Sequence, residues 1–241
     1  SRIRHALGGV RTRQTSNWPS VSFLDMPIEY SEVDTICAVE QMLKLGVSLI
    51  IVLGGDGTHR VVAKVCKDTP LIAVSTGTNN AFPEIREATV AGLAAGLVAM
   101  EKVNLADVTS KNKVMHVDLN GSGHDIALVD LCVSTECWIG TRALWQPDTL
   151  KELFVTVASP SSIGLSAIAG YLNPVSRFAD HGLRLLLAPP GEGKFTVSVP
   201  IAPGLMEPIG IADLKVIRPG EKYAVETRRG TLAFDGERSV E

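Results

Sequence analysis

The chain has 241 residues, of which 45% are hydrophobic, enough to bury the core of one large or two small domains. Its formal charge is −3 and its basic residues are scattered without interleaved aromatics, which argues against a nucleic-acid partner. Four cysteines without a C-x-x-C pair are typical of reduced core thiols, so we expect a cytoplasmic protein.

The most apolar window, residues 90–100, is too short to cross a bilayer, so no membrane partner is expected. The chain starts at Ser1 without a methionine and without an opening strand. We therefore expect that N-terminal residues are missing.

The first predicted elements are a helix and a strand. Ser31 followed by Asp34 resembles a capping box, and an apolar stripe at helical spacing then runs as far as Gly46. Residues 47–53 form a near-continuous apolar run that is rich in β-branched side chains. Such a run is typical of a parallel strand that is covered on both faces.

A glycine-rich turn follows this strand and reads Gly54-Gly55-Asp56-Gly57-Thr58. Glycines remove side-chain bulk where a polyanion approaches the backbone, and a helix over 58–67 would direct its free N–H groups to the same place. We interpret the turn as a phosphate-binding loop in which Asp56 carries the chemistry. The alternative is that Asp56 only hydrogen-bonds its own loop.

A second apolar strand, residues 71–74, runs into a second turn and then a helix over 88–100. Ligands bind at the carboxyl ends of strands in open parallel sheets, so both turns are expected to line one crevice. Neutral groups suited to ribose or phosphate stand in the second turn, at Thr76, Gly77, Thr78, Asn79 and Asn80. An ordinary connection, whose asparagines accept left-handed backbone angles, is the alternative.

From residue 102 the apolar residues alternate or run together as in strands, which predicts a β-rich domain. The expected domains are therefore 1–101 and 102–241, with a C-terminal tail that can return to the first domain. Strands are expected over 103–108, 114–119, 125–133, 183–187, 195–199, 214–217, 223–227 and 230–237. A helical interlude is expected around 141–158 and a small-residue segment over 161–170. Asp235-Gly236 is also a common hairpin signal.

The histidines carry weaker signals. His59 and Arg60 follow the first turn closely enough to meet a phosphate, yet solvated positions on a helix are the more frequent outcome. Core or surface positions are expected for the remaining histidines, which show no metal-ligand spacing: His116, His124 and His181.

Three motifs occur in order: the first turn, the second turn with Ala81-Phe82-Pro83 behind it, and Phe234-Asp235-Gly236-Glu237. The set resembles the superfamily of NAD kinases, diacylglycerol kinases and sphingosine kinases. Within it, the chain from about Phe23 to the end is most similar to the acetoin catabolism protein X group of ATP-NAD kinase-like proteins.

The resemblance implies a fold of the α/β plus all-β class, with a Rossmann-like N-terminal domain and a C-terminal β-sandwich that enclose a nucleotide. It implies phosphoryl transfer from ATP with Mg²⁺ to a small-molecule nucleotide such as NAD. Asp56 would be the general base or the Mg²⁺ ligand, and Glu237 competes for the role of base, as in the lipid kinases. Phosphates and nucleotide would contact Gly54, Gly55, Gly57, Thr58, the second turn and Asp235. β-Sandwich domains of these kinases commonly pair, so a homo-oligomer is implied as well.

The chain also departs from the NAD kinase pattern. The Asn-Glu pair that reads NAD corresponds to Val129-Asp130, and the Thr-Gly-Ser-Thr-Ala-Tyr segment corresponds to residues 161–166, without the tyrosine. The N-terminal Asn-Pro phosphate motif is absent. Three hypotheses therefore stay open: a kinase of NAD or a related nucleotide, a kinase of a lipid or another small hydroxyl compound, and a non-catalytic nucleotide-binding regulator. The identity of the phosphate donor, ATP or polyphosphate, stays open too.

Overall fold

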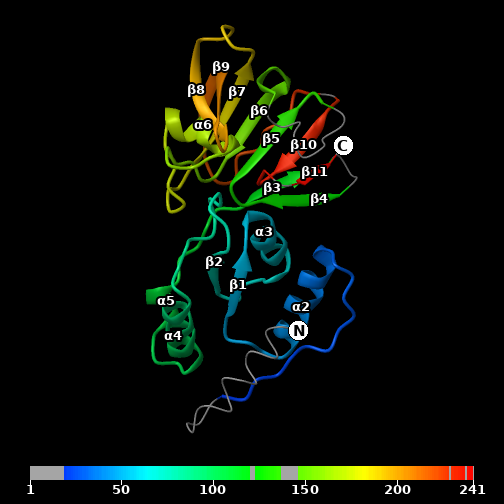
Figure 1. The fold of residues 1–241 in the computed structure, drawn as a ribbon, viewed down its shortest axis with the longest axis vertical. Coiled ribbons are helices and arrows are strands. Elements are labelled where there is room, and N and C mark those ends of the chain that lie inside the picture. Colours follow the sequence, from blue (N-terminus) through cyan, green and yellow to red (C-terminus); the bar gives the residue numbers. More distant parts are fainter. Residues whose placement is uncertain (1–18, 120–122, 137–145, 228, 237, 241) are drawn as a thin grey trace.

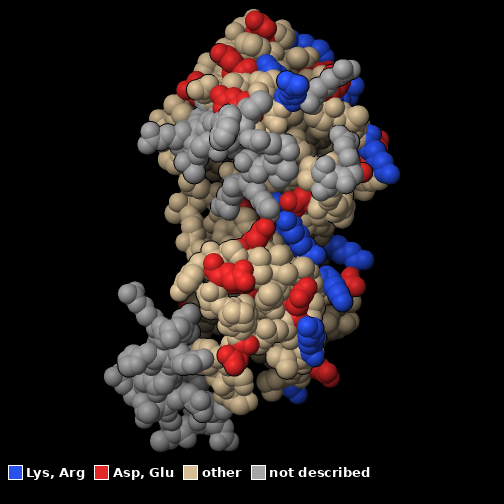
Figure 2. All heavy atoms as spheres, turned by 90° about the vertical axis from the view of Figure 1, so that its right-hand side faces the viewer, with Lys and Arg blue, Asp and Glu red and all other residues tan. Residues whose placement is uncertain are grey.

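The structure is a computed structural model that describes residues 19–119, 123–136, 146–227, 229–236 and 238–240. An α/β lobe and a β-rich lobe lie end to end (Figure 1). Basic and acidic side chains are intermixed on the face drawn in Figure 2. Three cysteines in the described part of the chain are free, namely Cys37, Cys66 and Cys132.

The first helix of the α/β lobe, α2 (Glu32–Lys44), begins where the sequence predicts. The Ser31 hydroxyl accepts a hydrogen bond from the N–H of Val33 and caps the helix. The Asp34 carboxylate reaches back to the N–H groups of Glu29 and Tyr30, at 2.8 and 2.9 Å. The side chains of Ser31 and Asp34 therefore fix both the start of the helix and the chain that enters it.

Two parallel strands, β1 (Ile50–Gly54) and β2 (Leu71–Ser75), form the sheet of this lobe. Helix α3 (Asp56–Val65) connects them and packs with α2 on one face of the sheet, where Val39, Ile50, Val52 and Val62 form the core. The parallel pair with its crossover helix confirms the predicted α/β architecture.

The expectation that this first strand is covered on both faces is wrong. Residues of β1 alternate between buried and exposed, and Ile51 and Leu53 are 40% and 65% exposed. Their face is open because α4 (Ala88–Ala99), the next helix, does not pack on it and buries only Ala91. The apolar composition of residues 47–53 therefore did not correctly predict which faces of the strand are buried.

The predicted strand over 103–108 is a short helix, α5 (Leu105–Val108). The Asn104 side chain accepts a hydrogen bond from the N–H of Ala106 and so acts as an N-cap. This local side-chain bond outweighs the alternation of apolar residues on which the strand prediction rested.

The β-rich lobe confirms the predicted β-rich C-terminal domain. Its main sheet is antiparallel and has the strand order β11-β10-β5-β6-β7-β9-β8. The strands are β5 (Asp130–Ser134), β6 (Leu150–Val155), β7 (Gly182–Ala188), β8 (Phe195–Ala202), β9 (Leu205–Ile217), β10 (Thr231–Phe234) and β11 (Arg238–Val240). A separate hairpin consists of β3 (Met115–Asp118) and β4 (His124–Ala127).

Alternate residues of the main sheet face two different layers. Cys132, Leu153 and Val155 belong to a core that includes Ile168 of helix α6 (Leu165–Leu172). Leu131, Val133, Phe154 and Phe234 point the other way and pack with Val117 and Ala127 of the hairpin. The period of two along each strand thus places α6 on one face and the hairpin on the other.

Two further predicted elements are wrong. The helix expected around 141–158 is instead a short 3₁₀ turn, η2 (Pro147–Thr149), followed by strand β6. Residues 150–155 form a strand because they pair with strands on both sides. Residues 137–145 lie outside the described residues. No strand forms over 223–227. The N–H of Glu226 is bonded instead to the Glu152 carboxylate, which also holds Arg184 at 2.7 Å.

None of the helices in the described ranges combines the length and the apolar composition that a membrane crossing requires.

Leucine-to-alanine substitutions are expected to change the free energy of unfolding differently in the two lobes, because one leucine is buried and the other is exposed. Leu185→Ala deletes a fully buried side chain of β7 and is expected to cost about 2–5 kcal/mol. Leu53→Ala, on the open face of β1, is expected to change stability by no more than about 0.5 kcal/mol. Urea unfolding followed by circular dichroism measures both, and a comparable loss in both variants would contradict the open face.

Candidate functional site

Asp56 ties the first glycine-rich turn to the second turn. It is the first residue of α3, and its carboxylate accepts hydrogen bonds from the N–H groups of Ala81 (3.0 Å) and Phe82 (2.8 Å). Only 8% of Asp56 is exposed. Burial raises the pKa of its carboxyl, although the two N–H groups oppose the shift. The motif aspartate is therefore a fixed, buried group between two loops.

Gly54, the last residue of β1, must be a glycine for a steric reason. A Cβ on Gly54 would lie 2.6 Å from the Cβ of Thr58, so only glycine allows the turn to fold back on itself. Gly55 is the N-cap of α3 in an extended conformation. Phosphate binding by Gly54, Gly55, Gly57 and Thr58 stays a prediction.

The second turn is held by hydrogen bonds around Ser75. The Ser75 hydroxyl donates to the carbonyl of Gly77 at 2.7 Å and accepts from the Asn80 amide at 2.7 Å. Asn80 therefore shapes the turn. Thr76, Thr78 and Asn79 are exposed, and the Thr78 hydroxyl donates to the Asn79 side chain at 3.2 Å.

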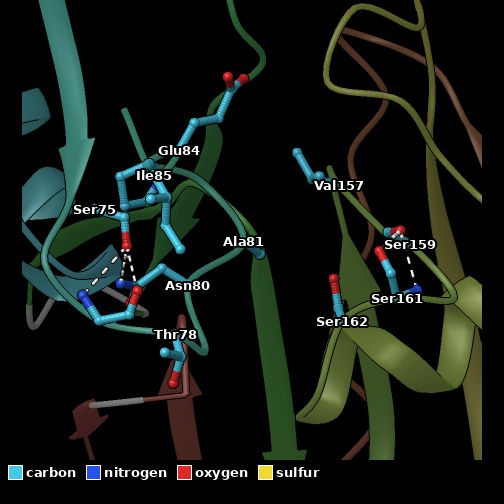
Figure 3. A pocket seen from close by; sticks show the side chains of 12 residues that line it. Ser75, Thr78, Asn80, Ala81, Glu84, Ile85, Val157, Ser159, Ser161 and Ser162 are labelled. Carbon is cyan, nitrogen blue, oxygen red and sulfur yellow. Dashed lines mark hydrogen bonds between the residues drawn. The ribbon is translucent and has the colours of Figure 1, made fainter. Parts of the chain in front are cut away.

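A cavity of about 330 Å³ lies between this turn and the β-rich lobe (Figure 3). The α/β lobe lines it with Ser75, Gly77, Thr78, Asn80, Ala81, Pro83, Glu84 and Ile85, and the other lobe with Val157, Ser159, Ser161 and Ser162. Hydroxyl and amide groups thus face each other across it. Residues 54–58 of the first turn are not among these lining residues, although Asp56 contacts Ala81 and Phe82 directly beside them, so the expectation that both turns line one crevice stays a prediction.

Arg177 holds the second turn from the β-rich lobe. Its guanidinium donates to the carbonyl of Ala81 at 3.2 Å and to the carbonyl of Phe82, and it lies 5.4 Å from the centre of the Phe82 ring. It also pairs with Glu84 at 3.6 Å. The same two residues that give their N–H groups to Asp56 therefore give their carbonyls to Arg177. Nothing in the sequence around Arg177 indicated this contact.

Asp235 lies in the turn between β10 and β11, as the hairpin interpretation predicts. Its φ of +49° and the +67° of Gly236 fit the tight turn that an Asp-Gly pair favours. The carboxylate accepts hydrogen bonds from the N–H groups of Leu128, Val129 and Asp130. Burial raises its pKa to about 6. Its proposed contact with a ligand stays a prediction, and Glu237 lies outside the described residues.

Asp130 completes a group of three carboxyls at the junction of the lobes. It is 4% exposed, and its Oδ1 has no hydrogen-bond partner within the described part of the chain. Burial raises its pKa to about 8, with further contributions from the negative charges of Asp235 and Asp56. Asp130 corresponds to the NAD-reading glutamate in the resemblance, but its burial was not foreseeable from sequence.

Arg60 provides positive charge beside these carboxyls. Its guanidinium lies 3.2 Å from Asp125 and 3.9 Å from Asp235, and it lies over the Phe234 ring. Lys64 pairs with Asp125 at 2.7 Å. The expectation that Arg60 is solvated is wrong, because this ion pair across the lobes buries it.

His59 is also buried, contrary to expectation. Its Nδ1 bonds to the carbonyl of Gly55 at 2.8 Å, and its Nε2 has no partner in the described ranges. Its ring lies 5.9 Å from the Phe82 ring. Burial lowers the pKa of His59, which favours the neutral form of its imidazole. No group of three or more His, Cys, Asp or Glu residues suited to a metal occurs among the described residues.

The raised pKa of Asp130 predicts a pH-dependent stability. The folded protein binds the Asp130 carboxyl proton more tightly than the unfolded chain does. The contribution of this proton to the free energy of unfolding is therefore present at low pH and is lost as the pH rises through about 8. The melting temperature of the wild type is therefore expected to fall progressively as the pH rises from about 4 to about 8, and that of Asp130→Asn to fall less. Thermal melts across this range test it, and equal slopes in both proteins would refute it.

Comparisons with known proteins agree with this two-lobe arrangement. A family profile described as the acetoin catabolism protein X C-terminal domain matches residues 113–241. Another, described as the ATP-NAD kinase N-terminal domain, matches residues 5–102. Acetoin catabolism protein X of Cupriavidus necator is 47% identical over 229 residues, which cover 93% of this chain and 64% of that protein. The chain thus spans less than two thirds of this relative. It belongs to the acetoin catabolism protein X family, with an N-terminal domain of the ATP-NAD kinase type.

Proposed function

We propose that the protein is a Mg²⁺-dependent phosphotransferase that transfers the γ-phosphate of ATP to a hydroxyl of NAD or a related nucleotide. The observation that carries the proposal is the position of Asp56, whose carboxylate holds the turn that lines the pocket between the lobes. The ATP-NAD kinase type of the N-terminal domain supports a kinase. The name of the relative refers to acetoin catabolism and specifies no phosphate acceptor.

The pocket suits the uncharged, hydroxyl-bearing part of an acceptor. Its lining offers the side chains of Ser75, Thr78 and Asn80 on one side and three serines on the other. No lysine or arginine is among these lining residues, and Glu84 is the charged group. Hydroxyl and amide groups can orient a ribose through neutral hydrogen bonds, whereas a polyphosphate would need cations or a helix N-terminus.

Asp56 is suited to accept the proton of the attacking hydroxyl. Burial raises its pKa, which makes the carboxylate a stronger base than an ordinary aspartate. The N–H groups of Ala81 and Phe82 fix its orientation while leaving lone pairs on both oxygens. Phosphoryl transfer depends mainly on such positioning and on neutralising charge, because little covalent assistance is needed.

The residues present fit a magnesium ion that is shared with a substrate. Mg²⁺ in such sites takes one or two carboxylates and completes its coordination with phosphates and water. Asp130, whose Oδ1 has no hydrogen-bond partner in the described residues, would hold it, and Asp56 would join it only in the alternative in which Asp56 binds the metal instead of the hydroxyl proton. When bound, the ion would neutralise the phosphate oxygens of ATP.

A second candidate is a kinase of a lipid or another apolar hydroxyl compound. Helix α4 exposes an apolar stripe, with Val90 and Leu93 63% and 66% exposed, and Ile85 of the pocket lining is 76% exposed. A kinase that takes its acceptor from a membrane needs an apolar surface of this kind near its cleft.

The central prediction concerns turnover. With Mg²⁺-ATP and NAD, a coupled NADP-specific dehydrogenase is expected to report NADP formation, and Asp56→Ala to lower kcat by about 10²–10⁴-fold. Asp56→Asn keeps one of the two acceptor oxygens but turns its NH₂ group toward the other N–H, so thermal melts of both variants are compared with their kcat to separate lost chemistry from a disturbed loop. Asp213→Ala, at a half-buried position on β9 outside the pocket, is the control and is expected to keep full activity.

Undiminished turnover in Asp56→Ala would remove Asp56 from the mechanism. If no NADP forms while calorimetry still detects ATP binding, NAD is not the acceptor. Diacylglycerol in mixed micelles then tests the lipid alternative, and ATP binding without any phosphorylated product would identify a nucleotide-binding regulator.

A second prediction tests the pocket itself. Ser162→Phe places a large ring in the cavity and is expected to raise KM for the acceptor by about tenfold or more, because the ring occupies acceptor space. KM for ATP is expected to change little. Ser110→Phe, at an exposed position outside the pocket, is the control. Steady-state kinetics measure both constants, and an unchanged acceptor KM in Ser162→Phe would place the acceptor elsewhere.

A further inference from the structure

Two histidines meet on the outer face of the β3–β4 hairpin. In the register of the hairpin, His116 lies opposite Ile126, and Asp118 lies opposite His124. The two histidines are therefore diagonal neighbours on the same face, a relation that long side chains can bridge. Both are exposed to solvent, as is Asp118 on the same face, whereas Val117 on the other face is buried.

The two imidazoles are close and have suitable atoms facing each other. His116 Nδ1 lies 3.1 Å from His124 Nε2, and the ring centroids are 5.1 Å apart. Without a metal, one nitrogen donates a hydrogen bond to the other. The same two nitrogens can both direct lone pairs to the space between the rings once that proton moves to the other nitrogen of its own ring.

The separation matches the spacing of neighbouring ligands around a transition metal. Two nitrogens at about 2.0–2.1 Å from a tetrahedral Zn²⁺ are about 3.3–3.4 Å apart, and neighbouring ligands of a square-planar ion are about 2.9 Å apart. The observed 3.1 Å lies between these values. Small rotations of the two rings are therefore enough to bind a metal.

We propose that His116 Nδ1 and His124 Nε2 bind a divalent transition-metal ion of the Cu²⁺, Ni²⁺ or Zn²⁺ class, with water in the remaining positions. In the described part of the chain no third His, Cys, Asp or Glu joins them as the side chains stand. Asp118, opposite His124, is the carboxylate that a rotamer change would bring to the ion. Imidazole ligands favour these ions over Mg²⁺, which prefers oxygen ligands.

Binding there would join two strands that, within the described ranges, pair only with each other. The hairpin packs on the main sheet through Val117 and Ala127, and a metal that bridges β3 and β4 would add to the stability of the hairpin. The hairpin also carries Asp125, which pairs with Arg60 and Lys64 of α3 next to the junction of the lobes (Figure 1). The site is separate from the serine-lined pocket and does not depend on the proposed kinase activity.

The test is calorimetric titration of untagged protein with CuCl₂, ZnCl₂ and MgCl₂ at pH 7.5. We expect one ion per chain, tighter binding of Cu²⁺ than of Zn²⁺ as the Irving–Williams order requires, and no binding of Mg²⁺ at this site. His116→Gln and His124→Gln are each expected to weaken Cu²⁺ binding by about tenfold or more, since each removes one of two protein ligands. Both positions are exposed, so the variants are expected to fold.

The matched control is His181→Gln, which changes a histidine that pairs with Asp180 outside the hairpin and is expected to bind Cu²⁺ like the wild type. The double variant measures what other groups, including the thiols, contribute. A wild type that binds no more Cu²⁺ than the double variant would overturn the proposal, as would an equal loss in His181→Gln. A metal-induced rise in melting temperature that the double variant lacks would support it.

Discussion

The candidate site depends on one buried carboxylate that is bonded to a neighbouring loop. Asp56 accepts the N–H groups of Ala81 and Phe82, and Arg177 takes the carbonyls of the same two residues from the other lobe. Loops are usually the most variable parts of an α/β domain. In the second turn, however, the N–H groups of these two residues bond to Asp56 and their carbonyls bond to Arg177. The pocket wall therefore has a defined shape before any ligand arrives, which reduces the entropy cost of binding.

Charge balance at the junction of the lobes follows from the same arrangement. Asp56, Asp130 and Asp235 are buried near one another, and burial raises the pKa of each carboxyl. Arg60 supplies positive charge on one side, and Oδ1 of Asp130 has no hydrogen-bond partner among the described residues, so we propose this oxygen as the position for a proton or a cation. A site with excess carboxylate is consistent with a substrate that arrives with magnesium, since the ion restores neutrality.

Sequence reasoning succeeded where the signal is local and failed where it depends on packing. A glycine turn directly after an apolar strand predicted the position of Asp56, and the Asp-Gly pair predicted the β10–β11 hairpin. The contact of Arg177 with the second turn joins residues that are 95 positions apart, and no local pattern encodes it. Leu53 is exposed because helix packing, rather than composition, decides which face of a strand is covered. His116 and His124 were judged by linear spacing, whereas strand register brings them together.

The central claim is that both lobes contribute to one acceptor site beside Asp56. A crystal structure of the protein with Mg²⁺, NAD and a non-hydrolysable ATP analogue tests it most directly. The account predicts electron density for NAD between the second turn and Ser159, Ser161 and Ser162, with a ribose hydroxyl within hydrogen-bond distance of Asp56. Well-defined NAD bound elsewhere on the protein, with the pocket between the lobes filled by water, would contradict it.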